Sequence, residues 1–136
     1  MTLIGGFPAK ADPKRDAFLL DCRLADGSGK TVRIDPRLQR VQELDPVTGK
    51  VKNTITTVEP PAELGGGIID DSTVKITERE IEWSTRMYRP QYMAETHTIN
   101  RQTLTYTGQT SIQRDGGPDI DERGVSGTCQ RIPKLP

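Results

Sequence analysis

The stretch that decides the fold runs from residue 17 to residue 24 and reads AFLLDCRL. Within it, Phe18, Leu20, Cys22 and Leu24 recur at every second position. A period of two is typical of a β-strand with one buried face, because successive side chains of a strand point to opposite sides of the sheet. The folded part of the chain therefore begins with a half-buried strand.

The same period recurs along the rest of the chain. Asp26-Gly27 marks a tight turn after the first strand, since this dipeptide favours hairpins. About eight short strands separated by turns predict an all-β fold, a small antiparallel barrel or sandwich. The further strands are expected at residues 31–34, 38–44, 50–58, 73–77, 80–84, 96–99, 103–107 with an extension to 114, and 125–132.

A helix is the alternative over residues 77–86, where Thr-Glu-Arg-Glu resembles a helix start. We prefer a strand, because Ile81 and Trp83 are two positions apart and no apolar residue follows at helical spacing.

The length of 136 residues fits one domain. We assign residues 17–132 to this domain, residues 1–16 to a flexible tail or the remnant of a signal peptide, and residues 133–136 to a second tail. Residues 59–67 contain paired prolines and three glycines, which predict a loop. The other long connections are expected at residues 87–93 and, as an acidic loop, at 115–124.

Hydrophobic residues make up only 32% of the chain, below the roughly 45–50% of an average globular protein. Such a thin core favours a covalent cross-link. Cys22 and Cys129 are the only cysteines and lie in the first and last expected strands. A disulfide between them would stabilise the fold by roughly 4–5 kcal/mol in the chain-entropy model. The alternative is two buried free thiols.

The 19 basic and 19 acidic residues balance and are interspersed. Nucleic acid is therefore not an expected partner, because the sequence has no basic stripe to neutralise phosphates. No apolar run approaches the roughly 20 residues that span a bilayer. We expect no metal and no cofactor, since His97 is the only histidine and no C-x-x-C motif occurs.

Ala9-Lys10-Ala11 matches the A-x-A pattern that signal peptidases accept, and Leu3, Ile4 and Phe7 precede it. Together with the cysteine pair, this pattern favours a periplasmic or secreted protein. The alternative is a frayed, slightly apolar tail.

The order of these signals resembles a pattern in short exported proteins of unknown function from Gram-negative bacteria. It runs from a cysteine-bearing strand and Ile34-Asp35 through Ile-Glu-Trp at 81–83 and Ile-Asn-Arg-Gln-Thr-Leu at 99–104 to Gly-Thr-Cys at 127–129. The resemblance implies a small antiparallel barrel or sandwich and export, and carries no activity with it. A weaker similarity is to periplasmic lysozyme-inhibitor barrels, whose inhibitory loop signature is absent here.

One cluster combines aromatic and basic residues: Tyr88 and Tyr92 with Arg86 and Arg89. Aromatic and arginine side chains are enriched at interface hot spots. We therefore expect a partner-binding surface at residues 86–93, and assign the nearby Trp83 to the core.

Other polar groups favour structural roles. Asp115, Asp119, Asp121 and Glu122 could hold calcium, but their spacing is not that of an EF-hand and a solvated loop is preferred. The alternation of Glu78, Glu80 and Glu82 is typical of a polar strand face. We expect His97 to be an exposed or half-exposed strand residue. The glycines at 65–67 lack the Lys-Ser/Thr of a phosphate-binding loop, and Asn100-Arg101 marks a hairpin turn.

We expect a non-enzymatic, exported domain that binds a protein or small ligand, because one histidine cannot complete a nucleophile, base and orienting group. The alternatives are a periplasmic enzyme inhibitor or immunity-type protein and a structural subunit of a larger assembly.

Overall fold

The computed structural model describes residues 15–58, 70–88, 92–113 and 120–133. These residues form one antiparallel sheet of nine strands, which confirms the all-β prediction with one strand more than about eight. The strands are β1 (Phe18–Leu24), β2 (Gly29–Asp35), β3 (Arg40–Leu44), β4 (Val51–Ile55), β5 (Asp70–Ile76), β6 (Glu80–Met87), β7 (Tyr92–Asn100), β8 (Thr105–Gln113) and β9 (Ile120–Ile132).

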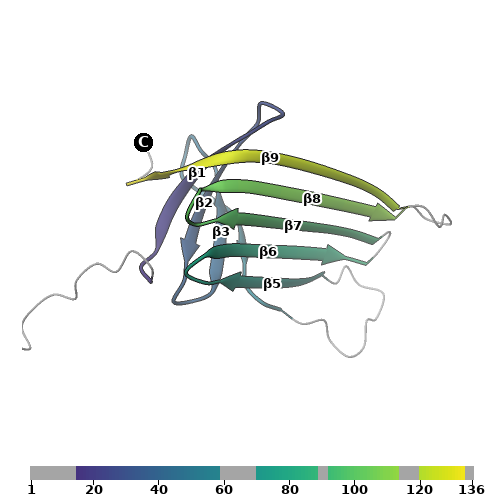
Figure 1. The fold of residues 1–136 in the computed structure, drawn as a ribbon. Coiled ribbons are helices and arrows are strands. Elements are labelled where there is room, and N and C mark those ends of the chain that lie inside the picture. Colours follow the sequence, from purple (N-terminus) through teal and green to yellow (C-terminus); the bar gives the residue numbers. More distant parts are fainter. Residues whose placement is uncertain (1–14, 59–69, 89–91, 114–119, 134–136) are drawn as a thin grey trace, which may run out of the picture.

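The first and last strands are neighbours in the middle of this sheet, whose order is β4-β3-β2-β1-β9-β8-β7-β6-β5 (Figure 1). Cys22 of β1 lies directly opposite Cys129 of β9. The two residues form a disulfide across 107 positions of sequence, as predicted. The cross-link therefore joins the two halves of the sheet, which we call the small arm (β1–β4) and the large arm (β5–β9).

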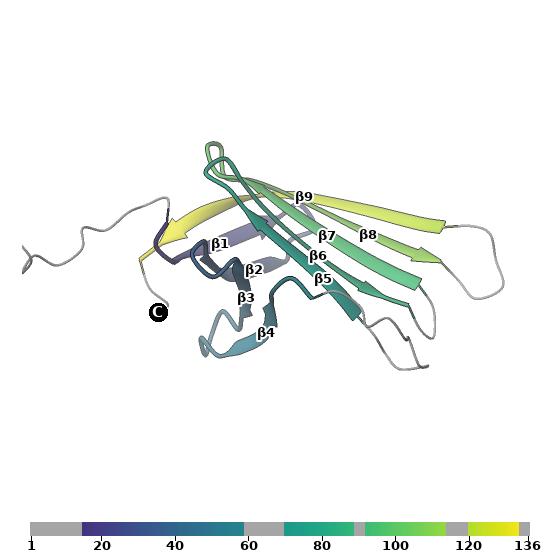
Figure 2. The same ribbon diagram turned by 90° about the horizontal axis from the view of Figure 1, so that it is seen from below.

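The sheet curls into a nearly closed barrel. The small arm covers only part of the large arm, whose longer strands extend past it (Figures 1 and 2). The closed end of the barrel is the end at which β6 begins and β7 finishes. The open end is the opposite one, where Met87 and Tyr92 lie. The two arms diverge toward the open end (Figure 2).

The core fills the space between the arms near the closed end. Trp83, Ile81 and Ile99 of the large arm are fully buried against Leu20 and Ile34 of the small arm. The burial of Trp83 confirms its assignment to the core. In the first strand, Phe18, Leu20 and Cys22 are buried as their alternation predicts.

The seam between the two arms is closed along β5 by three different partners. Ser72 exchanges both main-chain hydrogen bonds with Val58, at 2.8 and 3.0 Å. The Thr57 hydroxyl accepts from the Val74 N–H at 3.0 Å, and the Gln39 amide bonds Ile76. Since an unpaired strand edge exposes hydrogen-bonding groups, these contacts protect β5.

Two expected connections are shorter than the composition suggests. β6 continues to Met87 and β7 begins at Tyr92, so Met87, Tyr92 and Met93 of the expected connection 87–93 are strand residues. β9 begins at Ile120, so the second half of the expected loop 115–124 is also strand. The physical reason is pairing: Gln113 lies opposite Ile120, and continuous ladder bonds outweigh the weak strand preference of Asp and Gly.

Candidate functional site

A hollow lies between the two arms toward the open end, and we call it the inter-arm cleft. It consists of two adjoining pockets of 340 Å³ each, both lined by Glu95 and His97. Glu43 and Asn53 of the small arm line the first pocket, and Asp26 of the β1–β2 turn lines the second. The cleft is therefore a polar space above the apolar core.

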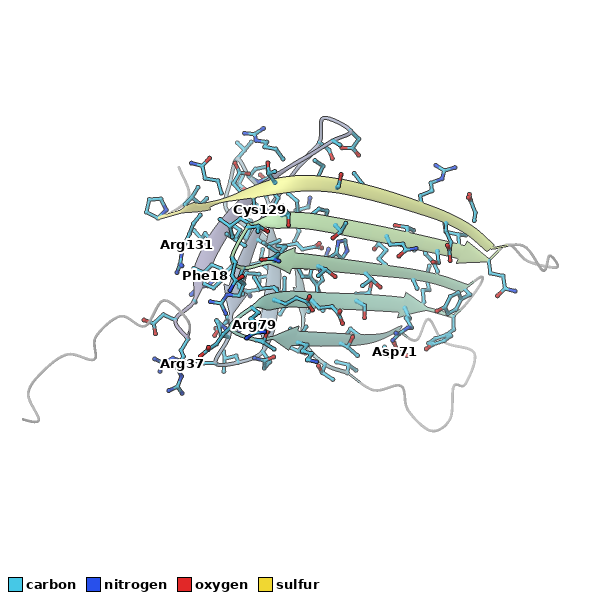
Figure 3. All side chains as sticks on the ribbon, viewed as in Figure 1. Phe18, Arg37, Asp71, Arg79, Cys129 and Arg131 are labelled. Atoms are coloured by element: carbon cyan, nitrogen blue, oxygen red, sulfur yellow. A yellow bond between two sulfur atoms is a disulfide. The ribbon has the colours of Figure 1, made fainter. Side chains whose placement is uncertain are left out.

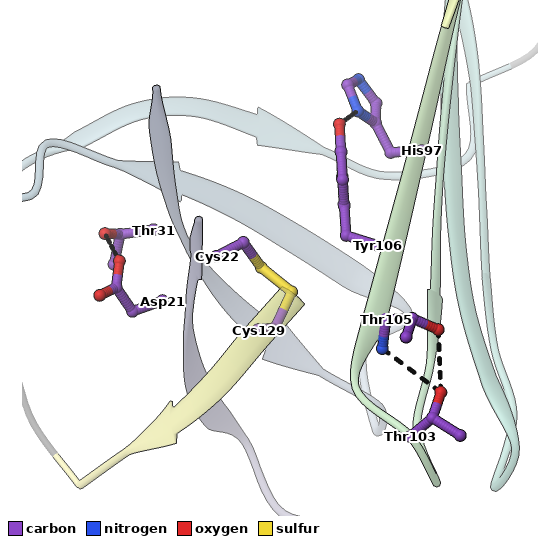
Figure 4. Close-up of a disulfide and its surroundings, with 8 residues drawn as sticks. All are labelled: Asp21, Cys22, Thr31, His97, Thr103, Thr105, Tyr106 and Cys129. Atoms are coloured by element: carbon purple, nitrogen blue, oxygen red, sulfur yellow. Dashed lines mark hydrogen bonds between the residues drawn. A yellow bond between two sulfur atoms is a disulfide. The ribbon is translucent and has the colours of Figure 1, made fainter. Parts of the chain in front are cut away.

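His97 lies at the base of the cleft and is only 9% exposed. Its ring stacks on Trp83 with centroids 4.8 Å apart and an interplanar angle of 17°. Its Nδ1 atom lies 2.6 Å from the Tyr106 hydroxyl (Figure 4). Strand register explains this cluster, because Trp83, His97 and Gly108 lie directly opposite one another on β6, β7 and β8.

Gly108 makes the contact between His97 and Tyr106 possible. A Cβ atom at position 108 would lie 2.5 Å from the Tyr106 hydroxyl oxygen and 3.1 Å from its ring carbon Cζ. Both separations are shorter than ordinary van der Waals contact. Glycine is therefore the residue that leaves room for the tyrosine ring.

Burial determines the protonation of this pair. It lowers the pKa of His97 from 6.5 to about 4, and the nearby charge of Lys30 acts in the same direction against that of Glu43. Burial also raises the pKa of Tyr106 to about 12. At neutral pH the imidazole is therefore uncharged and the tyrosine protonated. In one tautomer of the neutral imidazole Nδ1 accepts from the Tyr106 hydroxyl, and in the other Nδ1–H donates to the hydroxyl oxygen.

An ion pair lies on the small-arm wall of the cleft, opposite His97. Lys30 Nζ is 2.8 Å from Glu43 Oε2, and Asn53 Nδ2 donates to Glu43 Oε1 at 3.0 Å. Burial alone would raise the pKa of Glu43, but the hydrogen bond and charge of Lys30 outweigh it and hold that pKa below its ordinary value. The Glu43 carboxylate is therefore ionised and already partnered.

Two polar groups on the large arm have spare hydrogen-bonding capacity. Within the described residues, the side-chain carboxylate of half-buried Glu95 makes no ion pair or hydrogen bond. The Trp83 Nε1–H is buried and likewise finds no acceptor there. A buried donor without an acceptor is costly, and a half-buried carboxylate gains from a hydrogen-bond donor, so both groups favour a bound polar molecule.

The cleft's residues were not identified by the sequence analysis as a set. Lys30, Glu43, Glu95 and Tyr106 come from four strands, and only the pairing of those strands brings them together. His97 was expected to be exposed or half-exposed, and this was wrong. It shares a face with Ile99, and that face packs on the core. The spacing Tyr106-x-Gly108 was the one local sequence signal of the contact between His97 and Tyr106.

The predicted partner surface is brought together in part. Asp71, which is labelled in Figure 3, lies near the open end and is surrounded by Arg86, Tyr88 and Tyr92. Arg89 lies outside the described residues. Arg86 Nη1 is 3.1 Å from Asp71 Oδ1, and the Tyr88 hydroxyl donates to Asp71 Oδ2. The Tyr88 and Tyr92 rings are 5.8 Å apart. Asp71 also lines the first pocket of the inter-arm cleft, so this Asp71 cluster adjoins the cleft.

The remaining carboxylates do not converge. Asp121 and Glu122 are neighbours in β9 and therefore point to opposite faces. Asp115, Asp119 and the glycines at 65–67 lie outside the described residues.

Glu78 precedes β6, and only Glu80 and Glu82 share its outer face. Among the described side chains, no group of three or more His, Cys, Asp or Glu could hold a metal ion. In that same part of the chain, no helix has the length and apolar character needed to cross a membrane.

The Asn100-Arg101 turn forms as predicted. Asn100 Oδ1 accepts hydrogen bonds from the Gln102 and Thr103 N–H groups at 2.8 and 3.0 Å, and Arg101 donates to the Thr77 carbonyl at 2.7 Å. The left-handed residue is Leu104, with φ of 59°, and not Asn100.

No protein-family model, no curated protein and no solved structure matches the chain.

Proposed function

We propose that this protein is a non-enzymatic binding domain of an oxidising, exported compartment, and that it holds a small polar ligand in the inter-arm cleft. One observation carries the proposal: the half-buried Glu95 carboxylate lacks a partner in the described part of the chain and faces a cleft with a lysine–glutamate pair. A half-buried carboxylate gains most from a ligand that donates hydrogen bonds to it.

The size and lining of the cleft support a small molecule. Each pocket, at 340 Å³, falls near the lower end of the roughly 300–1,000 Å³ of typical ligand sites. Lys30, Glu43 and Asn53 offer a donor and acceptors on one wall, opposite Glu95 on the other. A molecule with several hydroxyl, amine or amide groups matches this arrangement.

The chemistry of the cleft supports binding without catalysis. Nδ1 of His97 is occupied by Tyr106, and its low pKa leaves it a weak base at neutral pH. Both cysteines are held in the disulfide and supply no thiol nucleophile. The same disulfide supports export, because such bonds persist in oxidising compartments.

A screen of small polar compounds tests the proposal. Amino acids, polyamines, and mono- and disaccharides are added at millimolar concentration to the full chain, and amide NMR shifts are recorded. We expect a binder to shift the amides of Glu95, His97 and Glu43. Glu95→Gln should weaken that binder about tenfold or more, the cost of losing one charged hydrogen bond.

The matched control is Glu122→Gln, which removes one carboxylate from an exposed position of β9. This variant should bind like the wild type. A screen without any binder, or shifts that lie outside the cleft, would contradict the proposal.

A protein-binding role, including enzyme inhibition, is the second candidate. The Asp71 cluster favours it, because Asp71 fixes Arg86 and Tyr88 beside Tyr92 before any partner arrives. Tyr92→Ala should then abolish capture of a periplasmic partner while the thermal unfolding midpoint stays nearly unchanged. Retained capture would exclude this surface.

A further inference from the structure

The charged side chains of the inter-arm cleft do not balance. In the first pocket, the charged lining residues that the structure describes are all acidic: Glu43, Asp71 and Glu95. Lys30 lies 2.8 Å from Glu43 and Arg86 lies 3.1 Å from Asp71, so cations outside the lining compensate these two carboxylates. Glu95 has no such counter-ion in the described ranges. The first pocket therefore carries a surplus of one negative charge.

The second pocket leaves this surplus in place. Its charged lining residues are Glu95 again, Asp26 and Arg123. Asp26 and Arg123 carry opposite charges, which cancel in the sum. Arg123 is also 78% exposed and lies 3.6 Å from Asp121, so little of its charge is left for Glu95. Because Glu95 lines both pockets, an anion placed where they adjoin would be repelled.

The floor of the cleft is under the same negative potential. Burial first, and then the charges of Glu43, Glu95 and Asp26, raise the pKa of Tyr106 to about 12. These carboxylates come from β3, from β7 and from the β1–β2 turn, yet all of them act on one buried hydroxyl. A cation in the cleft above Tyr106 is therefore attracted by several carboxylates at once.

Strand register places Glu95 beside a second group that lacks a partner. Trp83 lies directly opposite His97, and Glu95 is two residues before His97 on the same face of β7. Glu95 and Trp83 are thus diagonal neighbours, a relation in which roughly 7–8 Å separates two residues of adjacent strands. Both line the first pocket, and the fully buried Trp83 offers an Nε1–H that has no acceptor in the described part of the chain. A ligand that bonds both groups needs a cation and a hydrogen-bond acceptor a few bonds apart.

The uncharged lining of the first pocket favours a hydroxylated ligand. Thr85 lies directly opposite Glu95, and its hydroxyl forms no hydrogen bond within the described residues. Hydroxyl and amide groups bond the hydroxyl groups of a ligand, which donate as well as accept. A purely alkyl ammonium ion would leave this lining without partners. The uncharged polar residues of the lining are Asn53, Thr54, Ser72 and Thr85.

We infer that the inter-arm cleft selects a hydroxylated primary ammonium ion, an amino alcohol or amino sugar, and this rests on the binding role proposed above. The ammonium group bonds the Glu95 carboxylate, and the hydroxyl groups bond the Trp83 Nε1–H and Thr85. The single surplus charge selects one cationic group. An amino acid fits less well, because its carboxylate would lie close to Glu95 while Lys30 is already held by Glu43.

Two matched pairs of probes test the selection of a cation. Glucosamine and ethanolamine carry an ammonium group in slightly acidic solution, and glucose and ethylene glycol are their neutral hydroxyl counterparts. Trp83 is the only tryptophan, so its indole N–H resonance and its fluorescence report binding to the full chain. We expect each charged probe to shift the indole resonance saturably and to bind at least about tenfold more tightly than its neutral counterpart.

Glu95→Gln keeps the shape of the side chain and removes its charge. Because the Glu95 carboxylate bonds nothing in the described part of the chain, the variant should unfold at the same urea concentration as the wild type. In this variant glucosamine should bind about as weakly as glucose. Glu122→Gln removes the same charge from an exposed position of β9 and should keep the preference of the wild type for glucosamine.

The outcomes separate the ligand class from the binding role. Equal binding of glucosamine and glucose to the wild type would overturn the selection of a cation and leave the cleft a site for polar ligands. A preference for glucosamine that survives in Glu95→Gln would also overturn it, because another group would then supply the charge. Failure of both charged probes to bind saturably, while a neutral compound of the screen binds, would exclude the ammonium class. A screen in which no compound binds would overturn both proposals.

Discussion

The side-chain amide of Gln39 bonds Ile76 as a neighbouring strand would. Its Oε1 atom accepts from the Ile76 N–H at 2.8 Å, and its Nε2 atom donates to the Ile76 carbonyl at 3.1 Å. Gln39 has a positive φ of 50°, which is uncommon for a residue other than glycine. The chain therefore accepts local strain at the β2–β3 connection and closes the seam of the barrel with it.

Gln39→Ala should destabilise the protein by about 1–3 kcal/mol, because it leaves the partly buried N–H and C=O of Ile76 without partners. Hydrogen exchange should show faster loss of protection at the Ile76 amide than at Val74, which keeps Thr57. Gln42→Ala is the control, since Gln42 makes one exposed bond to Thr54. Equal exchange in the two variants would mean that Gln39 does not close the seam.

Removal of the disulfide should have the largest effect on stability. Cys22→Ala/Cys129→Ala opens a loop of 107 residues, for which the chain-entropy model gives roughly 4–5 kcal/mol. Denaturant unfolding should therefore shift strongly to lower urea concentration. Reductant should shift the wild type in the same direction and leave the double variant unchanged. A double variant as stable as the wild type would show that burial alone stabilises the sheet.

The sequence predicted the sheet well where one face is buried. Phe18, Leu20 and Cys22 alternate with solvent-facing positions, so their period of two is clear. The disulfide could be predicted because the two cysteines lie in the first and the last of the expected strands. Strand ends were less predictable, since Asp121 and Glu122 enter β9 through pairing with β8, which no local propensity indicates.

The cleft was largely beyond sequence reasoning. Glu43 and Glu95 are 52 positions apart along the chain and meet only because the arms fold over one another. His97 lies between two threonines in the sequence, and this polar context indicates an exposed residue. Its neighbours on the adjacent strands, Trp83 and Gly108, instead place it in the interior. Contacts across strands, and not local composition, determine the burial of such a residue.

Gly108→Ala should disrupt the tyrosine–histidine contact. The added methyl group would lie 2.5 Å from the Tyr106 hydroxyl oxygen, so the ring must move, at a cost of about 1–3 kcal/mol. In a Tyr106→Phe background the same substitution should cost less, because the closest atom is gone. Denaturant unfolding of the two single variants and the double variant measures this coupling. Additive effects would contradict the role assigned to Gly108.

The burial of His97 predicts a loss of stability in mild acid. Its pKa falls from 6.5 in the unfolded chain to about 4 in the folded protein, so between these values the unfolded state binds more protons and unfolding becomes easier as the pH falls. Above pH 6.5 this contribution is fully present, and below about pH 4 roughly 3 kcal/mol is lost. Since His97 is the only histidine, one imidazole resonance reports its titration directly.

That resonance should titrate with a midpoint near pH 4 while the protein remains folded. His97→Gln keeps a polar group that can bond Tyr106 but removes the titration, so its free energy of unfolding should change less than that of the wild type between pH 7 and pH 4.5. The variant also controls for carboxylates that titrate in the same range, because they are common to both proteins. Parallel pH profiles, or a midpoint near 6.5, would show that the imidazole is solvated and that the base of the cleft is open to water.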